Sequence, residues 1–113
     1  INSSTGGVIF TPGYVISLKE TSASWSSAKS WCSSYGDGKW YLPTSNQLKD
    51  IYNQKSTLNN TLSTCGGTTL GTSYYWSSTE YSSNYAYCVA FSNGNSYDYY
   101  KSNSYQVRAV RAL

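Results

Sequence analysis

The segment from Ser73 to Tyr105 limits the fold more than any other part of the chain, because it combines tyrosine with small polar residues. Nine of its 33 residues are Tyr, nine are Ser and four are Asn. A tract of Ser and Asn alone is typical of disordered chain, but nine tyrosine side chains favour an ordered surface. Binding loops use this mixture, because Tyr gives a large, stiff contact while Ser and Asn supply adaptable hydrogen bonds. The composition therefore predicts recognition rather than catalysis.

Strand and turn signals divide this segment and the residues after it into a meander. Four runs are predicted to be strands: Tyr74 to Ser77, Tyr85 to Phe91, Ser96 to Lys101 and Gln106 to Ala112. Asn93-Gly94, between the second and the third run, is a strong signal for a tight turn.

Alternation within each predicted strand separates a buried side from an exposed side. Between Tyr85 and Phe91 we expect the side that carries Tyr87 and Val89 to be buried, with Cys88 on the opposite side. In the following strand Tyr97 and Tyr99 share one side. Aromatic residues on a strand are more often core than ligand contacts, so loop tyrosines are the better candidates for binding.

The first part of the chain predicts two strands and a helix. Val8 to Phe10 and Tyr14 to Leu18 flank a turn at Pro12-Gly13. Ser22 or Ser24 then caps a helix whose apolar residues recur at spacings of three and four, and Gly36-Asp37-Gly38 ends it. That helix carries Trp25, Ala28, Cys32 and Tyr35.

A second helix is predicted to begin at Thr44, because Gln47 stands three residues later as in a capping box. A loop rich in Thr, Asn and Gly follows and runs through Cys65 to Gly71. All four tryptophans are expected in the core. We therefore predict one α+β domain over residues 1–113, with two helices packed on a mainly antiparallel twisted sheet.

Composition excludes several classes of protein. Charged residues make up only 12% of the chain, and its net charge is +3. The basic residues are scattered from Lys19 to Arg111 with no cluster or stripe, so we expect no nucleic-acid binding. No apolar run is long enough to insert into a membrane. The first residues lack the charged and apolar regions of a signal peptide, so we expect a mature product or a domain excised from a longer surface protein.

The three cysteines, Cys32, Cys65 and Cys88, leave at least one thiol unpaired. With no His and no close pair of cysteines, a zinc site is not expected. Export would permit one disulfide. We predict that Cys65, in a loop, pairs with Cys88, in a strand, while Cys32 is a buried thiol on a helix.

Catalysis has little support in the sequence. The chain has no His, which is the commonest acid–base residue, and no Ser in a Gly-x-Ser-x-Gly setting. Five dispersed acids suggest no glycosidase pair. We therefore expect no catalytic residues and no enzyme activity. A glycan-active enzyme is the weakest alternative.

Three short motifs carry a resemblance to a known family: Gly38 to Thr44, Tyr75 to Glu80, and Val107 to Arg111. Together with the helix around Trp25, they make residues 14–113 resemble the domain of unknown function 1566 family, whose members are predicted to have a C-type-lectin-like fold. The resemblance implies a bacterial surface or secreted adhesin module. One relative is the C-terminal domain of a bacterial collagen-like adhesin that binds sulfated glycosaminoglycans and trimerises.

Related C-type-lectin-like domains are targets of diversity-generating retroelements, and the composition from Tyr81 to Tyr105 is similar to their variable regions. A strand meander with no such history is the alternative. The chain departs from the lectins in lacking their Glu-Pro-Asn, Gln-Pro-Asp and Trp-Asn-Asp motifs. Its acids are too dispersed to suggest a calcium cage, so we expect no metal, no cofactor and no calcium requirement.

The candidate binding surface combines loop tyrosines, amides and two charged residues. It consists of Tyr81, Asn84, Tyr85, Asn93, Asn95, Asp98, Tyr100, Lys101, Asn103 and Tyr105. Lys101 is the basic residue expected to meet an anionic glycan. Glu80 is expected to pair with Arg108 or Arg111 and to hold the last strand.

We expect an extracellular or cell-surface module, bacterial or phage, that recognises a host glycan or a host surface protein. The alternative is a structural tip or oligomerisation domain of a surface fibre or pilus, in which the same residues pack against a sister subunit. Self-association into a homo-oligomer stays open.

Overall fold

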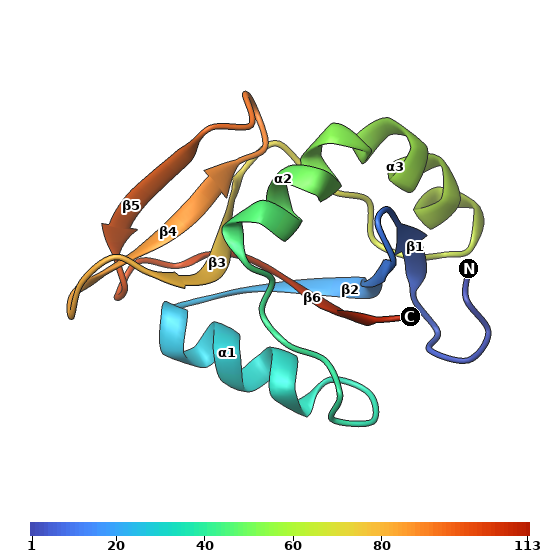
Figure 1. Ribbon diagram of the computed structural model, residues 1–113, viewed down its shortest axis with the longest axis horizontal. Coiled ribbons are helices and arrows are strands. Elements are labelled where there is room, and N and C mark those ends of the chain that lie inside the picture. The colour runs from blue at the N-terminus through green and yellow to red at the C-terminus, as the bar shows by residue number, and fades with distance from the viewer.

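The computed structural model describes all 113 residues and places a six-stranded sheet between helices. The elements are β1 (Val8–Phe10), β2 (Tyr14–Ala23), α1 (Trp25–Ser34), α2 (Ser45–Asn53), α3 (Lys55–Thr64), β3 (Tyr74–Glu80), β4 (Tyr85–Ala90), β5 (Ser96–Tyr100) and β6 (Tyr105–Ala112). The strand order is β1-β2-β6-β3-β4-β5, with only β3 and β6 parallel. In Figure 1, α2 and α3 cover one side of the sheet and α1 covers the other. The expected α+β class is confirmed.

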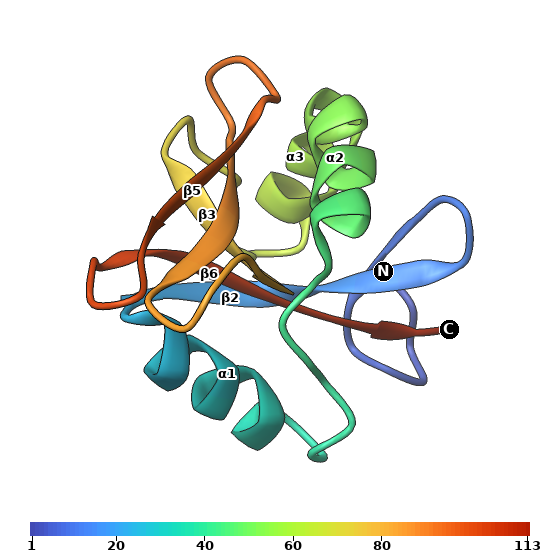
Figure 2. The same ribbon diagram turned by 60° about the vertical axis from the view of Figure 1, so that its left-hand side comes forward.

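The sheet is strongly twisted, so that β3, β4 and β5 stand steeply against β2 and β6 (Figure 2). All the predicted strands form, although β2 is longer than the predicted Tyr14 to Leu18 and extends to Ala23. The turn after β4 places Gly94 at φ 80°, a conformation that glycine adopts without steric cost.

The two predicted helices form, and one shows the predicted cap. The Gln47 backbone N–H donates to the Thr44 hydroxyl at 3.2 Å, and the Thr44 N–H donates to the Gln47 side-chain carbonyl at 3.0 Å. In α1, Ser24 is the N-cap residue but makes no side-chain capping bond. The first N–H of that helix, on Trp25, donates instead to the carbonyl of Lys101 at 2.9 Å.

The structure has a third helix that was not predicted, because α3 occupies most of the segment expected to be a loop. Its Thr, Asn and Ser residues have low helix propensity. The helix forms because Leu58 and Leu62 are buried under it. Asn59 adds two bonds to the backbone of Leu70, donating to its carbonyl at 3.0 Å and accepting from its N–H at 2.6 Å. Tertiary packing thus overrides local propensity here.

A separate hydrophobic core lies on each side of the sheet. Under α2 and α3 lie Val8, Phe10, Ile16, Leu48, Ile51, Leu58, Leu62, Leu70, Tyr75, Val89, Phe91 and Val110. On the side of α1 lie Val15, Trp25, Ala28, Cys32, Trp40, Leu42, Trp76, Ala86, Cys88, Val107 and Ala109. Three of the four tryptophans are therefore in the core as predicted, and Trp31 is half-buried.

Strand β4 contributes to both cores, which corrects the expected division of its two sides. Val89 is buried as predicted, but Cys88 on the opposite side is buried too. Tyr87, which was expected beside Val89 in the core, is only half-buried. A strand between two layers is apolar on both sides over part of its length, so simple alternation does not identify its exposed side.

Arg108 is the buried charge that holds β6 to an irregular part of β2. The register shifts between Ile16 and Glu20. The guanidinium, 1% exposed, donates to the carbonyls of Ser17 at 2.9 Å and Thr68 at 2.6 Å. It also pairs with the Glu20 carboxylate at 2.7 Å. Carbonyls freed by the irregular register thus find a donor, as buried polar groups require.

The prediction that Glu80 pairs with Arg108 or Arg111 was wrong. Glu80 pairs with Lys101, and Arg111 pairs with Asp37 at 2.9 Å. Lys101 and Asp37 lie in loops whose positions depend on the whole fold. The sequence alone therefore does not show which acid and which base come together.

The predicted disulfide between Cys65 and Cys88 is also wrong, since all three thiols are free. Cys65 packs at the rim of the core under α3, while Cys88 is in the other core. The sheet separates the two sulfur atoms. Cys32 is a buried thiol as predicted.

Candidate ligand-binding surface

The hairpin of β4 and β5 sorts the tyrosines of the chain onto two sides of the sheet. Tyr85 lies opposite Tyr100 in the register, and Tyr87 lies opposite Asp98. Directly opposed residues share a side, so these four side chains lie together. With the loop residue Tyr81 they form a surface that we call the outer tyrosine face: Tyr81, Tyr85, Tyr87, Asp98 and Tyr100.

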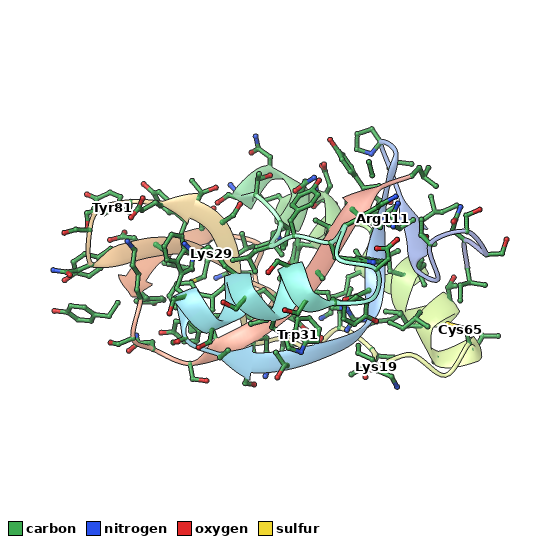
Figure 3. All side chains as sticks on the ribbon, turned by 90° about the horizontal axis from the view of Figure 1, so that it is seen from below. Lys19, Lys29, Trp31, Cys65, Tyr81 and Arg111 are labelled. Atoms are coloured by element: carbon green, nitrogen blue, oxygen red, sulfur yellow. The ribbon has the colours of Figure 1, made fainter.

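Ring contacts hold the outer tyrosine face together. Tyr85 and Tyr100 are stacked with centroids 4.7 Å apart. Tyr81 meets Tyr87 edge-on at 5.5 Å and Tyr85 at 6.4 Å. Tyr81 and Tyr100 are 57% and 56% exposed. In Figure 3, Tyr81 lies at one end of the molecule and Cys65 at the other. The face is thus an exposed aromatic platform on a rigid hairpin.

The opposite side of the hairpin carries a second group of tyrosines, the inner tyrosine cluster: Tyr74, Tyr97, Tyr99 and Tyr105. Tyr74 is at its centre, with ring centroids 5.1 Å from Tyr99, 5.1 Å from Tyr105 and 6.0 Å from Tyr97. The Tyr99 hydroxyl donates to the Tyr74 hydroxyl at 3.3 Å. These rings pack against the core on the side of α1.

Asp98 gives the outer tyrosine face its only charge. Three of the five acids, Glu20, Asp37 and Glu80, form ion pairs, but Asp98 has no basic partner and its side chain is exposed. The pKa of the Tyr85 phenol is raised, first by its hydrogen-bonding contact with Tyr100, then by desolvation and by the negative charge of Asp98. The face is therefore neutral to negative.

Lys101 does not point out from this surface as the predicted contact for an anionic glycan would. Its ammonium pairs with Glu80 and donates to the carbonyl of Ser83 at 2.9 Å. It also lies 4.5 Å from the ring centroid of Trp25. The hydrogen bond from Lys101 to Glu80, followed by the positive charge of Lys101, lowers the pKa of the Glu80 carboxyl. Lys101 thus joins the loop after β3 to the start of α1.

The other predicted contact residues fall into three places. Asn84 is exposed in the loop beside Tyr81, and its carbonyl accepts from the Lys101 N–H at 2.9 Å. Asn93 and Asn95 are exposed at the turn at the far end of the hairpin. Asn103 donates to the hydroxyl of Tyr105 at 3.1 Å on the side of the inner cluster. The structure therefore brings together only Tyr81, Asn84, Tyr85, Asp98 and Tyr100 of the predicted set.

Tyr105 was predicted to contact a ligand, but its ring packs inside the inner cluster. Its centroid lies 5.0 Å from Trp76 and 5.6 Å from Tyr99. Desolvation raises the pKa of its phenol. Conversely, Tyr87 belongs to the outer tyrosine face, although its position on the same side of the strand as Val89 predicted that it would be buried.

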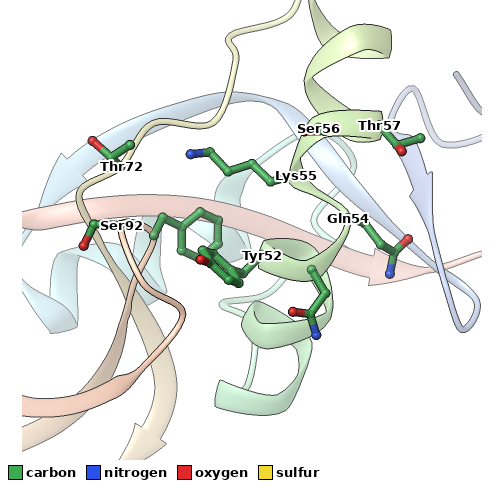
Figure 4. Close-up of a pocket in the computed structure, with 9 residues that line it drawn as sticks. Tyr52, Gln54, Lys55, Ser56, Thr57, Thr72 and Ser92 are labelled. Carbon is green, nitrogen blue, oxygen red and sulfur yellow. The ribbon is translucent and has the colours of Figure 1, made fainter.

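A polar hollow of about 440 Å³ lies between α2, α3 and the turn after β4, where no motif in the sequence predicted a site. Figure 4 shows the Lys55 side chain crossing this hollow toward Thr72, with Tyr52 below it. The ring of Tyr52 packs edge-on against Phe91 at 5.7 Å. Gly94 lets the Tyr52 ring lie close against the turn after β4, because a Cβ there would be 2.6 Å from that ring. The residues that line the hollow are Tyr52, Asn53, Gln54, Lys55, Ser56, Thr57, Thr72, Phe91 and Ser92.

Neither the outer face nor the hollow contains a group of side chains that could hold a metal ion. No three His, Cys, Asp or Glu side chains come together anywhere in the chain. The hollow is lined by hydroxyls, amides and one amine, with no carboxylate. None of the three helices combines the length and the apolar character that a membrane span requires. The groups present on these surfaces can stack, form hydrogen bonds and, at Asp98 and Lys55, pair with an opposite charge.

Comparison with known proteins identifies the family. A family model described as the Lcl C-terminal domain matches residues 4–111, and no curated protein matches the chain. The matching model carries a different name from the domain of unknown function 1566 family that the motifs suggested. The match indicates a surface, adhesin-like module, in agreement with that part of the expectation. Because the match covers nearly every residue, the chain belongs to the family of Lcl C-terminal domains.

Proposed function

We propose that this domain is a non-enzymatic binding module, displayed at or beyond a bacterial or phage surface, that attaches to a host glycan or host protein through the outer tyrosine face. Binding proceeds without calcium. The ligand covers Tyr81 and Tyr100 and reaches Asn84 and Asp98 at the rim.

The observation that carries this proposal is the pair of exposed rings, Tyr81 and Tyr100, each supported by a second ring. Tyr100 stacks on Tyr85 at 4.7 Å, and Tyr81 meets Tyr87 at 5.5 Å. A ring fixed in this way loses little further freedom when it binds, so most of its contact energy remains as affinity. Tyr is also among the residues that dominate binding energy at protein interfaces.

The chemistry of the surface supports binding rather than turnover. Asp98 is the only ionisable carboxylate on the face, and the chain has no His to act as a general base. Calcium sites gather six to eight oxygen ligands, usually with several carboxylates. The isolated Asp98 does not provide such a set.

The test is a glycan and host-protein array probed with wild type and with a Tyr81→Ala/Tyr100→Ala variant. Each truncation is expected to cost about 2 kcal/mol of binding free energy, or about 30-fold in Kd. An Ile9→Ala/Leu113→Ala variant is the matched control. It removes two exposed apolar side chains, 48% and 59% exposed, that lie outside the outer face.

Equal array signals from wild type and from the tyrosine variant would refute the proposed surface. Chelation of calcium should leave the wild-type signal unchanged. The alternative function, a structural tip or assembly domain, uses the same exposed rings as a subunit interface. It predicts a tight oligomer in light scattering that dissociates when Tyr100 is truncated.

A further inference from the structure

The sheet has two edges, and they differ in what they offer to another chain. At one edge lies β1, which is only three residues long. At the other lies β5, which spans five residues, Ser96–Tyr100. In Figure 1 no helix or loop covers the outer side of β5. An edge strand exposes unpaired N–H and C=O groups to which another strand can bind.

The hydrogen bonds of the hairpin show which of these groups are free. At one end the Lys101 N–H donates to the Asn84 carbonyl, and at the other the Ala90 N–H donates to the Asn95 carbonyl, each at 2.9 Å. The register between these ends is continuous. Because hydrogen-bonded and non-bonded pairs alternate in an antiparallel ladder, Tyr97 and Tyr99 bond to β4.

The backbone groups of Ser96, Asp98 and Tyr100 consequently point away from the sheet. The Tyr100 carbonyl accepts from the Asn103 N–H at 3.0 Å. The N–H and carbonyl of Asp98, at the middle of the strand, have no partner in the chain. This is the two-residue spacing with which an added strand forms its hydrogen bonds.

Lysine, proline and bulges, three common protections of an edge strand, are absent from β5. Natural edges often carry Lys or Pro, or a bulge that turns the edge away. Between Ser96 and Tyr100 there is no Lys and no Pro, and no register shift interrupts the pairing with β4. The only charged side chain is Asp98.

Asp98 indicates what kind of strand fits this edge. Its carboxylate is exposed, has no ion pair, and lies on the same side as Tyr85, Tyr87 and Tyr100. A residue directly opposite Asp98 on an added strand would have its Cα about 5.5 Å away. A Lys or Arg there could pair with the carboxylate and lie against a tyrosine ring, whereas an acidic residue would be repelled.

We propose that β5 binds an extended segment of a partner protein as an added strand, with a Lys or Arg of that segment opposite Asp98. This inference rests on the proposed binding function and narrows the ligand to a protein. Backbone hydrogen bonds to Ser96 and Asp98 hold the segment, and the outer tyrosine face contacts its side chains.

The experiment uses an arrayed library of peptides of about nine residues, long enough to cover β5 with flanks. The whole domain is used as the probe, and its binding to beads that carry dextran sulfate is measured in parallel as the test of glycan binding. Selected peptides are expected to carry Lys or Arg within an alternating, β-branched sequence. Their affinity should fall about fivefold for Asp98→Asn, and it should be unchanged for Asp50→Asn, which removes the other carboxylate that has no ion pair.

The backbone contact is tested separately with Ser96→Pro. The Ser96 N–H points outward, so proline removes a donor to the peptide without removing a bond of the hairpin. Affinity should fall about tenfold, and it should fall less for Ser96→Ala, which keeps the N–H. If Ser96→Pro does not fold by near-ultraviolet circular dichroism, N-methylation of alternate peptide residues applies the same test to wild type.

Failure to select any peptide, or binding that is indifferent to both Ser96→Pro and peptide N-methylation, would overturn the strand-addition proposal. If strand addition fails but the Tyr81→Ala/Tyr100→Ala variant loses the binding to dextran sulfate beads that wild type shows, the proposed function still holds. If every ligand binds the Tyr81→Ala/Tyr100→Ala variant as tightly as wild type, the proposed function itself is refuted.

Discussion

The inner tyrosine cluster and the outer tyrosine face contain the same residue type on the same hairpin, yet they have opposite roles. In the inner cluster, Tyr74 is in ring contact with three other tyrosines and its hydroxyl accepts a hydrogen bond. In the outer face, Tyr100 has one stacked neighbour and more than half of its side chain is exposed.

The difference shows that composition alone does not identify a binding surface. Successive strand residues point to opposite sides, so one Tyr-rich segment supplies a scaffold on one side and a free surface on the other. Truncation on the inner side should therefore cost stability, and truncation on the outer side should cost binding. The following predictions test this division, from the largest expected effect to the smallest.

The reactivity of the Cys88 thiol should show whether solvent reaches the side of the hairpin that carries the inner tyrosine cluster. Burial raises its pKa from 9.0 to about 12, so the thiolate fraction at about pH 8 should be about 1000-fold below that of a free thiol. In the native protein a thiol reagent should modify Cys65, which is half-exposed, long before Cys88. Mass spectrometry of the modified peptides measures both rates.

Two tyrosine variants make this measurement specific to one side. Tyr97 lies directly opposite Cys88, so Tyr97→Ala should accelerate the modification of Cys88. Tyr100→Ala, on the other side, should not. Equal acceleration by both variants would contradict the division of the hairpin into two sides.

Within the inner tyrosine cluster, Tyr74→Ala should be the most destabilising truncation. It removes a half-buried ring that contacts Tyr97, Tyr99 and Tyr105, so the free energy of unfolding should fall by about 2–3 kcal/mol. Urea denaturation measures the loss. A change below about 1 kcal/mol would mean that the inner cluster repacks around the cavity.

Tyr74→Phe separates the hydroxyl from the ring. The phenylalanine ring keeps the aromatic contacts but no longer accepts from the Tyr99 hydroxyl, so we expect a loss of about 1 kcal/mol. The same urea titration provides the measurement. A loss as large as that of Tyr74→Ala would show that the hydroxyl, and not the ring, holds the cluster.

The Tyr81→Ala/Tyr100→Ala variant should change stability least, by no more than about 1 kcal/mol, because both rings already face water. Its thermal unfolding should stay close to that of wild type while its binding is lost. A large loss of stability would make the outer face part of the scaffold and would remove the reason to treat it as a ligand surface.

Local signals in the sequence determined most of the elements. The capping box at Thr44, the glycines after α1 and the turn at Asn93-Gly94 depend on backbone geometry within a few residues, so their effect is the same in any fold. The strands of the carboxyl-terminal meander follow from alternating aromatic residues. The α+β class follows from the order of these elements.

Helix α3 could not be found in this way, because its residues are poor helix formers and only burial of Leu58 and Leu62 stabilises it. The ion pairs of Glu80 and Arg108 and the free state of Cys65 and Cys88 depend on distances between residues far apart in the chain. The structure brings together only half of the predicted site for a related reason: the sequence indicates which residue types favour binding, but not which side of the sheet each residue faces.

The sequence by itself thus determined that the chain builds a Tyr-rich hairpin on a scaffold of helices and strands. Only the tertiary structure decided that the inner tyrosine cluster packs against the core on one side of that hairpin, and that the outer tyrosine face and the edge of β5 stay exposed. The physical reason is that burial is a property of layers packed together, whereas propensity and alternation act within one strand and its turns.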